Sequence, residues 1–217
     1  MTPQSAQARI SPAYEKNYPP ILGVLSRLLA PPHPRGGHRH LRVLELGSGP
    51  GQHIASLARD LPYADWWPAE LPENLPSIHA WRAQAALQNL HPPRPIDLCQ
   101  PDWHHPFLDN APYDLIMSVN VIHASRPEVP PHLIAGAAPL LAPEGILWFY
   151  GPFRFPDTPL TPSNEAFDAA LKARGPGWGI RDTDRLDTLA AASGLERAGV
   201  EALPSNNHAL WWRKARG

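Results

Sequence analysis

Short apolar runs alternate with helical patterns along most of the chain, and no other feature constrains the fold as strongly. The runs end in glycine or polar residues, as buried strands do, and the segments between them repeat apolar residues at helical spacing. This alternation predicts an α/β protein with a parallel sheet and helices on both faces. We expect strands at 42–46, 64–71, 95–99, 113–122 and 145–153, and helices at 19–30, 52–60, 77–90, 132–142, 163–174 and 185–194.

The C-terminal part breaks this alternation. Two apolar runs, 195–203 and 208–214, follow one another with no helix between them, so they predict one antiparallel hairpin or one reversed strand at the edge of the sheet. Three helix ends are marked by residue type. Pro19 and Pro20 are typical of a helix start, Ser163 is a suitable N-cap with Ala166 at N3, and Gly194 is suited to the C′ position.

Length and composition exclude several classes of protein. A chain of 217 residues fits one domain, and a net charge of −1 gives no field that would attract nucleic acid or an anionic membrane. There is neither an apolar window of 18 residues nor the apolar core of a signal peptide, and Cys99 is the single cysteine. We therefore expect a cytoplasmic protein with no membrane or nucleic-acid partner. The chain has 29 prolines, and the proline-rich segment at 31–40 is predicted to be a linker. It also has 8 tryptophans, some of which are candidates to line a cleft.

The most informative motif is LELGSGPGQH at 44–53, in which Gly47, Gly49 and Gly51 follow the first predicted strand. A phosphate-binding P-loop requires a lysine after its last glycine, and here Gln52 stands in that place. A dinucleotide site requires the spacing G-x-G-x-x-G, which this turn does not have. S-adenosylmethionine carries no phosphate, and glycines let the backbone approach it closely. The structural alternative is a turn that only eases the packing of a helix on a strand.

Three acids stand where this cofactor needs them. Glu45 precedes the turn and can serve the ammonium group of the cofactor, whose carboxylate is favoured by the following helix N-terminus. Glu70 closes the second predicted strand and can accept both ribose hydroxyls, and Asp97 in the third can accept the adenine amino group. Together with the alternating pattern, these acids favour a site for S-adenosylmethionine at the carboxyl ends of the strands.

Longer motifs run from about Arg9 to Arg213: SPAYEKNYPPI at 11–21, LELGSGPGQH at 44–53, WWPAE at 66–70, DLCQPDW at 97–103, VNVIH at 119–123, FYGPF at 149–153, LTPSNEAFDAALK at 160–172 and PSNN at 204–207. Together they resemble one family of class I methyltransferases, known as methyltransferase-like twenty-six. Among the departures from its pattern, Lys16 stands in place of an arginine and Glu70 in place of an aspartate.

The resemblance implies a Rossmann-like class I methyltransferase fold: a seven-stranded, mostly parallel sheet with a C-terminal antiparallel strand and an N-terminal helix that can act as a lid. The expected single domain, 1–217, comprises an N-terminal helix and linker (1–40), a cofactor-binding core (41–153) and acceptor-side helices and final strands (154–217). The expected contacts to S-adenosyl-L-methionine are Asn17, Glu45, Gly47, Ser48, Gly49, Gly51, His53, Glu70, Asp97, Trp103 and Asn120.

Four residues near the ends of the later strands are the candidates for chemistry. His123 can act as a general base or orient the acceptor, and the alternative is a histidine packed at a helix start. Tyr150 and Arg154 flank the GPF motif, where Arg154 can clamp a carboxylate or phosphate or can be a surface arginine. Asn207, in the turn before the last strand, is either an acceptor contact or a turn former.

The sequence thus predicts methyl transfer from S-adenosylmethionine to O, N or S of a small-molecule acceptor, as in biosynthesis, by a monomer or homodimer. Two alternatives stay open: a non-catalytic protein that binds this cofactor as a partner or regulator, and a nicotinamide-dependent reductase on a related fold. No histidine pairs with cysteine or a carboxylate at ligand spacing, so no metal is expected. The chain also lacks the basic face and the NPPY-like motif of a nucleic-acid methyltransferase.

Overall fold

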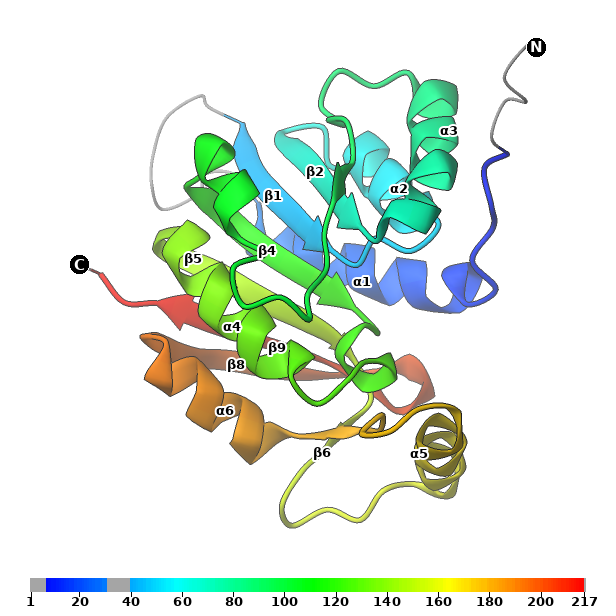
Figure 1. The fold of residues 1–217 in the computed structure, drawn as a ribbon, viewed down its shortest axis with the longest axis vertical. Helices are drawn as coiled ribbons and strands as arrows, with labels where there is room; N and C mark the ends of the chain where they lie inside the picture. Colours follow the sequence, from blue (N-terminus) through cyan, green and yellow to red (C-terminus); the bar gives the residue numbers. More distant parts are fainter. Residues whose placement is uncertain (1–6, 31–39, 217) are drawn as a thin grey trace. The chain divides into compact units, whose positions relative to one another are not determined.

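The structure, a computed structural model, describes residues 7–30 and 40–216 (Figure 1). Nearly all of the linker expected at 31–40 lies outside the described residues. The chain divides into two compact units, Met1–Ile96 and Asp97–Gly217. Within the described residues the main sheet has seven strands, in the order β3-β2-β1 in the first unit and β4-β5-β9-β8 in the second. The prediction of a mostly parallel sheet in an α/β fold is confirmed.

The first unit is built on three parallel strands, β1 (Leu41–Leu46), β2 (Ala64–Glu70) and the short β3 (Arg94–Pro95). Helix α2 (Gln52–Asp60) packs on β2 and contacts both α1 (Tyr14–Leu28) and α3 (Leu75–Ala85), which follows the short helix η1 (Pro72–Asn74). Every residue of β1 except Arg42 is buried, as expected for a parallel strand covered on both faces.

The second unit contains β4 (Tyr113–Val119), β5 (Leu141–Gly151), β8 (Leu195–Leu203) and β9 (Asn207–Lys214). Strand β9 runs antiparallel to both β5 and β8, which confirms the predicted C-terminal antiparallel strand. Helices α4 (Val129–Leu140) and α6 (Thr183–Ala192) lie side by side against these strands (Figure 1).

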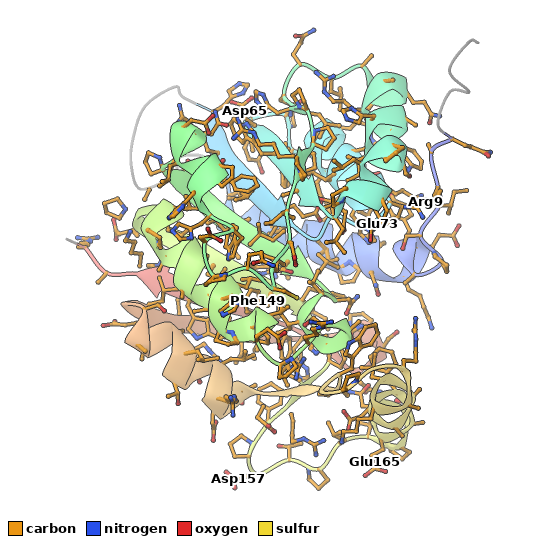
Figure 2. All side chains as sticks on the ribbon, in the orientation of Figure 1. Arg9, Asp65, Glu73, Phe149, Asp157 and Glu165 are labelled. Carbon is orange, nitrogen blue, oxygen red and sulfur yellow. The ribbon has the colours of Figure 1, made fainter. Side chains whose placement is uncertain are left out.

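A smaller layer of the second unit lies beyond the main strands. Strands β6 (Phe153–Arg154) and β7 (Arg181–Asp182) pair in parallel, and α5 (Pro162–Arg174) stands between them in sequence. Figure 2 shows Asp157, in the loop between β6 and α5, and Glu165 on α5 at its outer side, and both residues are exposed. Short helices η2 (His105–Asn110), η3 (Ile122–Ala124) and η4 (Pro204–Asn206) complete the unit.

Several predicted boundaries were wrong, and each has a local cause. Helix α1 begins at Tyr14, so Pro19 and Pro20 lie inside it rather than at its start. Helix α5 is capped by Thr161, whose hydroxyl accepts the backbone N–H of Asn164 at 3.4 Å, so Ser163 is not the N-cap and Ala166 is not at N3. Gly194 does follow the cap of α6 and has φ +73°, as predicted.

Tryptophan side chains supply much of the core. Trp66 in the first unit and Trp148 and Trp212 in the second are fully buried. The Trp212 indole donates to Asp187 Oδ1 at 2.7 Å, and Arg197 lies over its ring at 4.8 Å from the centroid. Truncating a buried aromatic of this size costs about 3–5 kcal/mol, so these side chains contribute to stability rather than to a cleft.

Candidate functional site

The glycine turn links β1 to α2 in the first unit, and all three of its glycines are left-handed. The φ angles are +74° at Gly47, +55° at Gly49 and +93° at Gly51, a region that other residues enter only at a cost. A Cβ on Gly51 would lie 2.9 Å from the Cα of Ile78, whereas a Cβ on Gly49 would meet no atom within 4 Å. Gly51 is therefore required by packing, and Gly49 borders open space.

Glu70, at the end of β2, is tied to this turn. Its carboxylate accepts the backbone N–H of Gly49 at 2.6 Å and that of Leu71 at 2.7 Å. An ionised carboxylate has about four lone-pair sites, so two hydrogen bonds leave acceptor capacity for further donors. Glu70, the acid predicted from sequence, is thus held by backbone N–H groups of the glycine turn and of the residue that follows it.

Glu45, the second acid, is buried inside β1 with 1 % of its surface exposed, and its Oε2 atom has no hydrogen-bond partner among the described residues. Burial, with a further contribution from the Glu70 carboxylate, raises the pKa of Glu45 to about 8. A buried carboxyl oxygen without a partner is costly. It therefore marks a position that a donor or a cation would stabilise.

The first turn of α2 carries His53 into a small aromatic cluster. The Tyr14 ring meets the His53 ring edge-on at 5.2 Å and stacks on the Tyr18 ring at 5.0 Å. Burial lowers the pKa of His53 to about 4, and its Nε2 atom has no partner. His53 is therefore a neutral imidazole at physiological pH. Asn17 is buried in α1, while Ser48 is buried in the glycine turn itself.

The N-terminal segment reaches the glycine turn through Ser77 of α3. The backbone N–H of Arg9 donates to the Ser77 hydroxyl at 2.9 Å, and that hydroxyl donates to the carbonyl of Pro50 at 2.8 Å. The backbone N–H of Ser11 donates to the Gln52 side chain at 2.8 Å. Figure 2 labels Arg9 on this segment, with Glu73 nearby on η1, just before α3. The N-terminal helix expected as a lid is α1, and Tyr14, Lys16 and Asn17 lie within it rather than before it.

The other three predicted cofactor contacts, Asp97, Trp103 and Asn120, lie in the second unit. Asp97 follows β3 rather than standing in a strand, because β3 ends at Pro95, and its carboxylate accepts the backbone N–H of Cys99 at 2.9 Å. Trp103 is buried and packs against α4. Its indole donates to the carbonyl of His132 at 2.9 Å, and its ring leaves no room for a Cβ at Gly136.

Asn120 and His123 come together just beyond the end of β4. Asn120 has φ +57° and donates its backbone N–H to the carbonyl of Tyr150 at 2.9 Å. A Cβ on Gly151 would collide with Nε2 of His123 and lie 2.9 Å from Oδ1 of Asn120. Gly151 is the residue that allows these two polar side chains to meet at β5.

His123 is fully buried, and neither of its ring nitrogens has a hydrogen-bond partner in the part of the chain that the structure describes. Burial first, and the positive charge of Arg181 second, lower its pKa to about 3. Its ring packs edge-on against Phe153 at 5.1 Å. The imidazole is therefore neutral, with one N–H donor and one acceptor nitrogen that the surrounding side chains do not satisfy.

Tyr150 and Asn207 form a direct pair. The Asn207 amide donates to the Tyr150 hydroxyl at 3.0 Å, while the ring of Tyr150 is buried at the end of β5. Burial raises the pKa of Tyr150, and the bond from Asn207 opposes this shift. Asn120, His123, Tyr150 and Asn207 are thus gathered in one region of the second unit.

Arg154 is engaged within the protein. Its guanidinium lies 3.4 Å from the carboxylate of Asp168 and 3.3 Å from that of Asp182. Asp168 is buried, and it also accepts from Lys172 Nζ at 2.6 Å and from the backbone N–H of Ile180 at 2.7 Å. The sequence did not reveal Asp168, because Arg154 and Ile180 lie 14 and 12 residues away in the chain, and only Lys172 lies close, four residues on in α5.

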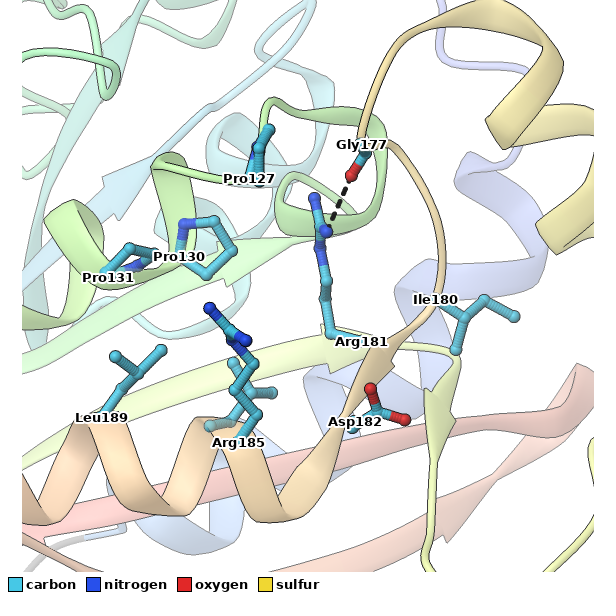
Figure 3. Close-up of a pocket in the computed structure, with 10 residues that line it drawn as sticks. Pro127, Pro130, Pro131, Gly177, Ile180, Arg181, Asp182, Arg185 and Leu189 are labelled. Carbon is cyan, nitrogen blue, oxygen red and sulfur yellow. Dashed lines mark hydrogen bonds between the residues drawn. The ribbon is translucent and has the colours of Figure 1, made fainter.

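Two of the cavities bordered by described residues of the second unit concern this region. One, of about 340 Å³, lies between the first turns of α4 and α6 and is bordered by Arg181 and Arg185 (Figure 3). Arg181 there is occupied in holding loops together, since it donates to the carbonyls of Ile122, Ser125 and Gly177 at 2.7–2.9 Å. The other, of about 460 Å³, is bordered by Phe153 and Asn207.

Two further features of the described residues concern ions and membranes. No set of three or more His, Cys, Asp or Glu side chains within residues 7–30 and 40–216 is arranged to hold a metal ion. In the same part of the chain no helix is long and apolar enough to cross a bilayer.

The chain belongs to a family described as DUF938, a protein of unknown function, whose model matches residues 8–214. Among solved structures, it is similar to an O-methyltransferase family protein from Burkholderia thailandensis, with a TM-score of 0.74 and 17% identity, over 94% of this chain and 58% of that one. It is also similar to PigF with SAH, with a TM-score of 0.72 and 14% identity, over 92% and 56% of the two chains.

A third similar structure is the mitomycin 7-O-methyltransferase MmcR, with a TM-score of 0.66 and 16% identity, over 81% of this chain and 49% of that one. The chain therefore spans between about half and three fifths of the length of these three structures. At such identities the similarity shows the fold alone, the Rossmann-like fold of these methyltransferases.

Proposed function

We propose that the chain binds S-adenosyl-L-methionine at the glycine turn of the first unit and transfers its methyl group to a small-molecule acceptor. One observation carries the proposal: the three left-handed glycines are flanked by two buried acids, one of them with an unpartnered oxygen. The methyltransferases of the same fold, one of them solved with SAH, support it. So does the resemblance of the motifs to the methyltransferase-like twenty-six family.

The residues of the first unit fit this cofactor. The remaining acceptor capacity of Glu70 suits two ribose hydroxyls, and the unpartnered oxygen of Glu45 suits the ammonium group. The open space at Gly49 lets the cofactor approach the backbone, and the start of α2 favours its carboxylate. When bound, the cofactor supplies an electrophilic methyl group on a sulfonium. We assign Asn17, Ser48 and His53 to the same cofactor site.

In the second unit we assign His123, Tyr150 and Asn207 to the acceptor. A neutral His123 can accept a hydrogen bond from the acceptor's O–H or N–H, and the Asn207–Tyr150 pair can orient the reacting atom. Asp97, Trp103 and Asn120 remain proposed cofactor contacts. Arg154 is the weakest candidate, because two aspartates already neutralise it.

Calorimetric titration with S-adenosylhomocysteine, together with turnover of methyl-labelled cofactor in cell extract, tests the proposal. We expect binding by the full chain, loss of at least tenfold in affinity in Glu70→Ala, and no change in the control Glu73→Ala, whose side chain is exposed three residues on. Tighter binding of NAD than of S-adenosylhomocysteine would indicate a reductase. Cofactor binding without any labelled product would indicate the non-catalytic alternative.

A further inference from the structure

The cavity of about 460 Å³ in the second unit is bordered by Asn207 and adjoins His123 and Tyr150, the three side chains that we assign to the acceptor. Phe153, which borders it, packs against the His123 ring at 5.1 Å, and Asn207, which also borders it, donates to the Tyr150 hydroxyl at 3.0 Å. Its volume of about 460 Å³ lies in the range of small-molecule sites, roughly 300–1,000 Å³. A molecule seated here would lie beside Phe153 and Asn207, the side chains that contact His123 and Tyr150.

The walls of this cavity are apolar and carry no formal charge. Aromatic and aliphatic walls come from β6, the loop after it and the end of β8, and they include Phe155, Leu160 and Leu203. Among the described residues that line it, none is Asp, Glu, Lys or Arg. His208 also lines it, and burial lowers the pKa of this imidazole, so it too is neutral. A charged ligand would lose its hydration here without gaining a counter-charge.

The polar side chains among the described lining residues are three asparagines, two threonines and His208. The amide nitrogens of the asparagines already donate within the protein: Asn164 to the backbone carbonyl of Asn206 at 3.1 Å, Asn206 to the Ser163 hydroxyl at 3.0 Å and Asn207 to the Tyr150 hydroxyl at 3.0 Å. Because a carbonyl can only accept, the bond to Asn206 fixes which end of the Asn164 amide is the nitrogen. The asparagines therefore offer a ligand their amide oxygens as acceptors, and an O–H or N–H donor on the ligand would match them.

From this lining we infer that the cavity binds a neutral, mainly apolar molecule that carries an aromatic ring and a hydroxyl or amino donor. The rings of Phe153 and Phe155 supply edges and faces for the ring of the ligand. The inference that this molecule is the methyl acceptor rests on the proposed function. The inference that it binds in this cavity does not. A negative group on this molecule would not find Arg154 available, since that guanidinium is held by Asp168 and Asp182.

The test uses three probes of one ring system and titrates each against the full chain by ligand-observed NMR. 2-Naphthol is neutral with a donor, 2-methoxynaphthalene lacks the donor, and 6-hydroxy-2-naphthoate adds a negative charge. We expect 2-naphthol to bind best, 2-methoxynaphthalene at least fivefold more weakly and 6-hydroxy-2-naphthoate at least tenfold more weakly. Equal binding of the charged probe, or no binding of 2-naphthol, would overturn the inference.

Two matched variants locate the binding. Val200 borders the cavity and is 49% exposed, and Leu108 on η2 does not border it and is 51% exposed. Val200→Lys should weaken the binding of 2-naphthol at least fivefold. It should also narrow or reverse the difference in affinity between 2-naphthol and 6-hydroxy-2-naphthoate. Leu108→Lys should change neither the affinity for 2-naphthol nor this difference. Unchanged thermal unfolding will show that both variants fold. Identical 2-naphthol affinity in Val200→Lys and the wild type contradicts this location.

The same variants separate this inference from the proposed function. If 2-naphthol binds as expected but no labelled methyl group is transferred from the cofactor to any extract component, the cavity assignment stands and the proposed function fails. If methyl transfer proceeds equally fast in the wild type and Val200→Lys, the proposed function stands and the cavity is not the acceptor site.

Discussion

The carboxylate of Glu70 accepts the backbone N–H of Gly49 at 2.6 Å, so the acid that ends β2 holds the turn that follows β1. Hydrogen bonds to a charged group are worth about 1.5–3 kcal/mol each. The proposed cofactor contact is thus also a structural residue of the ligand-free protein, and its variants should show both roles.

Glu70→Gln keeps the size of the side chain, but it removes the charge and one of the two acceptor oxygens. We expect the free energy of unfolding to fall by about 2 kcal/mol, because one of the two backbone N–H groups loses its partner. Urea denaturation measures this change. Glu73→Gln is the control at an exposed position, and an equal loss there would contradict the structural role of Glu70.

Gly49 and Gly51 should respond differently to alanine. Gly51→Ala forces a Cβ to within 2.9 Å of the Ile78 backbone at φ +93°, so it should destabilise the fold by about 2–4 kcal/mol. Gly49→Ala meets open space at φ +55° and should cost only about 1 kcal/mol. The open space is where we place the cofactor, so Gly49→Ala should lose S-adenosylhomocysteine affinity out of proportion to its stability. Thermal unfolding and calorimetry on both variants measure the two effects.

Glu45 should make the protein less stable as the pH rises. Burial raises the pKa of this carboxyl to about 8 in the folded state, while the unfolded chain ionises near 4.3. Its contribution is therefore fully present below about pH 4.3 and is lost as the pH rises toward 8. At about 1.4 kcal/mol per pKa unit, the loss is at most about 5 kcal/mol.

Urea titrations between pH 5 and 9 test this effect, with Glu45→Gln as the variant that cannot ionise. The wild type should lose stability relative to Glu45→Gln over this window, and a cationic ligand at the site should reduce the loss. Parallel pH profiles of the two proteins would mean that Glu45 is ionised in the fold.

His53 should act in the opposite direction, by making the fold sensitive to acid. Burial lowers its pKa to about 4, below the value of about 6.5 in the unfolded chain. Its contribution is present above about pH 6.5 and is lost as the pH falls toward 4, by about 3 kcal/mol in total. The variant His53→Gln should show a shallower decline in stability between pH 7 and 4 than the control His79→Gln, whose side chain is exposed.

Asp168 should be far more important for stability than Arg154. Asp168 is buried and accepts from Lys172, Arg154 and the backbone N–H of Ile180, so Asp168→Asn should cost about 3 kcal/mol. The Arg154 side chain is 40% exposed, and its ion pairs are screened by solvent, so Arg154→Ala should cost about 1 kcal/mol or less. An Arg154→Ala variant of normal stability that loses acceptor affinity would restore the clamp hypothesis.

The elements of the sheet could be predicted because each is a local pattern. The strand 42–46, the glycine turn and the helix from Gln52 to Asp60 were all visible as one apolar run, three glycines and a helical repeat. Helix boundaries were less predictable where a proline in the sequence indicated a helix start that the structure does not have. Pro19 lies in the second turn of α1, where the residues from Tyr14 onward already form the helix.

The site was predictable as a set of residue types but not as a set of contacts. Sequence placed Glu70 beside the turn, yet its bonds to Gly49 and Leu71 join residues up to 21 apart. The third strand was expected to carry Asp97, but the chain turns after Pro95, and Asp97 accepts from Cys99 instead. The partners of Arg154 and the cavity walls depend on tertiary packing, for which a single sequence carries no local pattern.

The N-terminal segment has a built-in spectroscopic probe. The indole Nε1 of Trp81 on α3 donates to the carbonyl of Arg9 at 2.8 Å, next to the hydrogen bonds that link Arg9 to Pro50 through Ser77. Indole emission shifts with the polarity and hydrogen bonding around the ring. Trp81 fluorescence, obtained as the difference between the wild type and Trp81→Phe, should therefore report whether this segment stays docked when a ligand reaches the glycine turn.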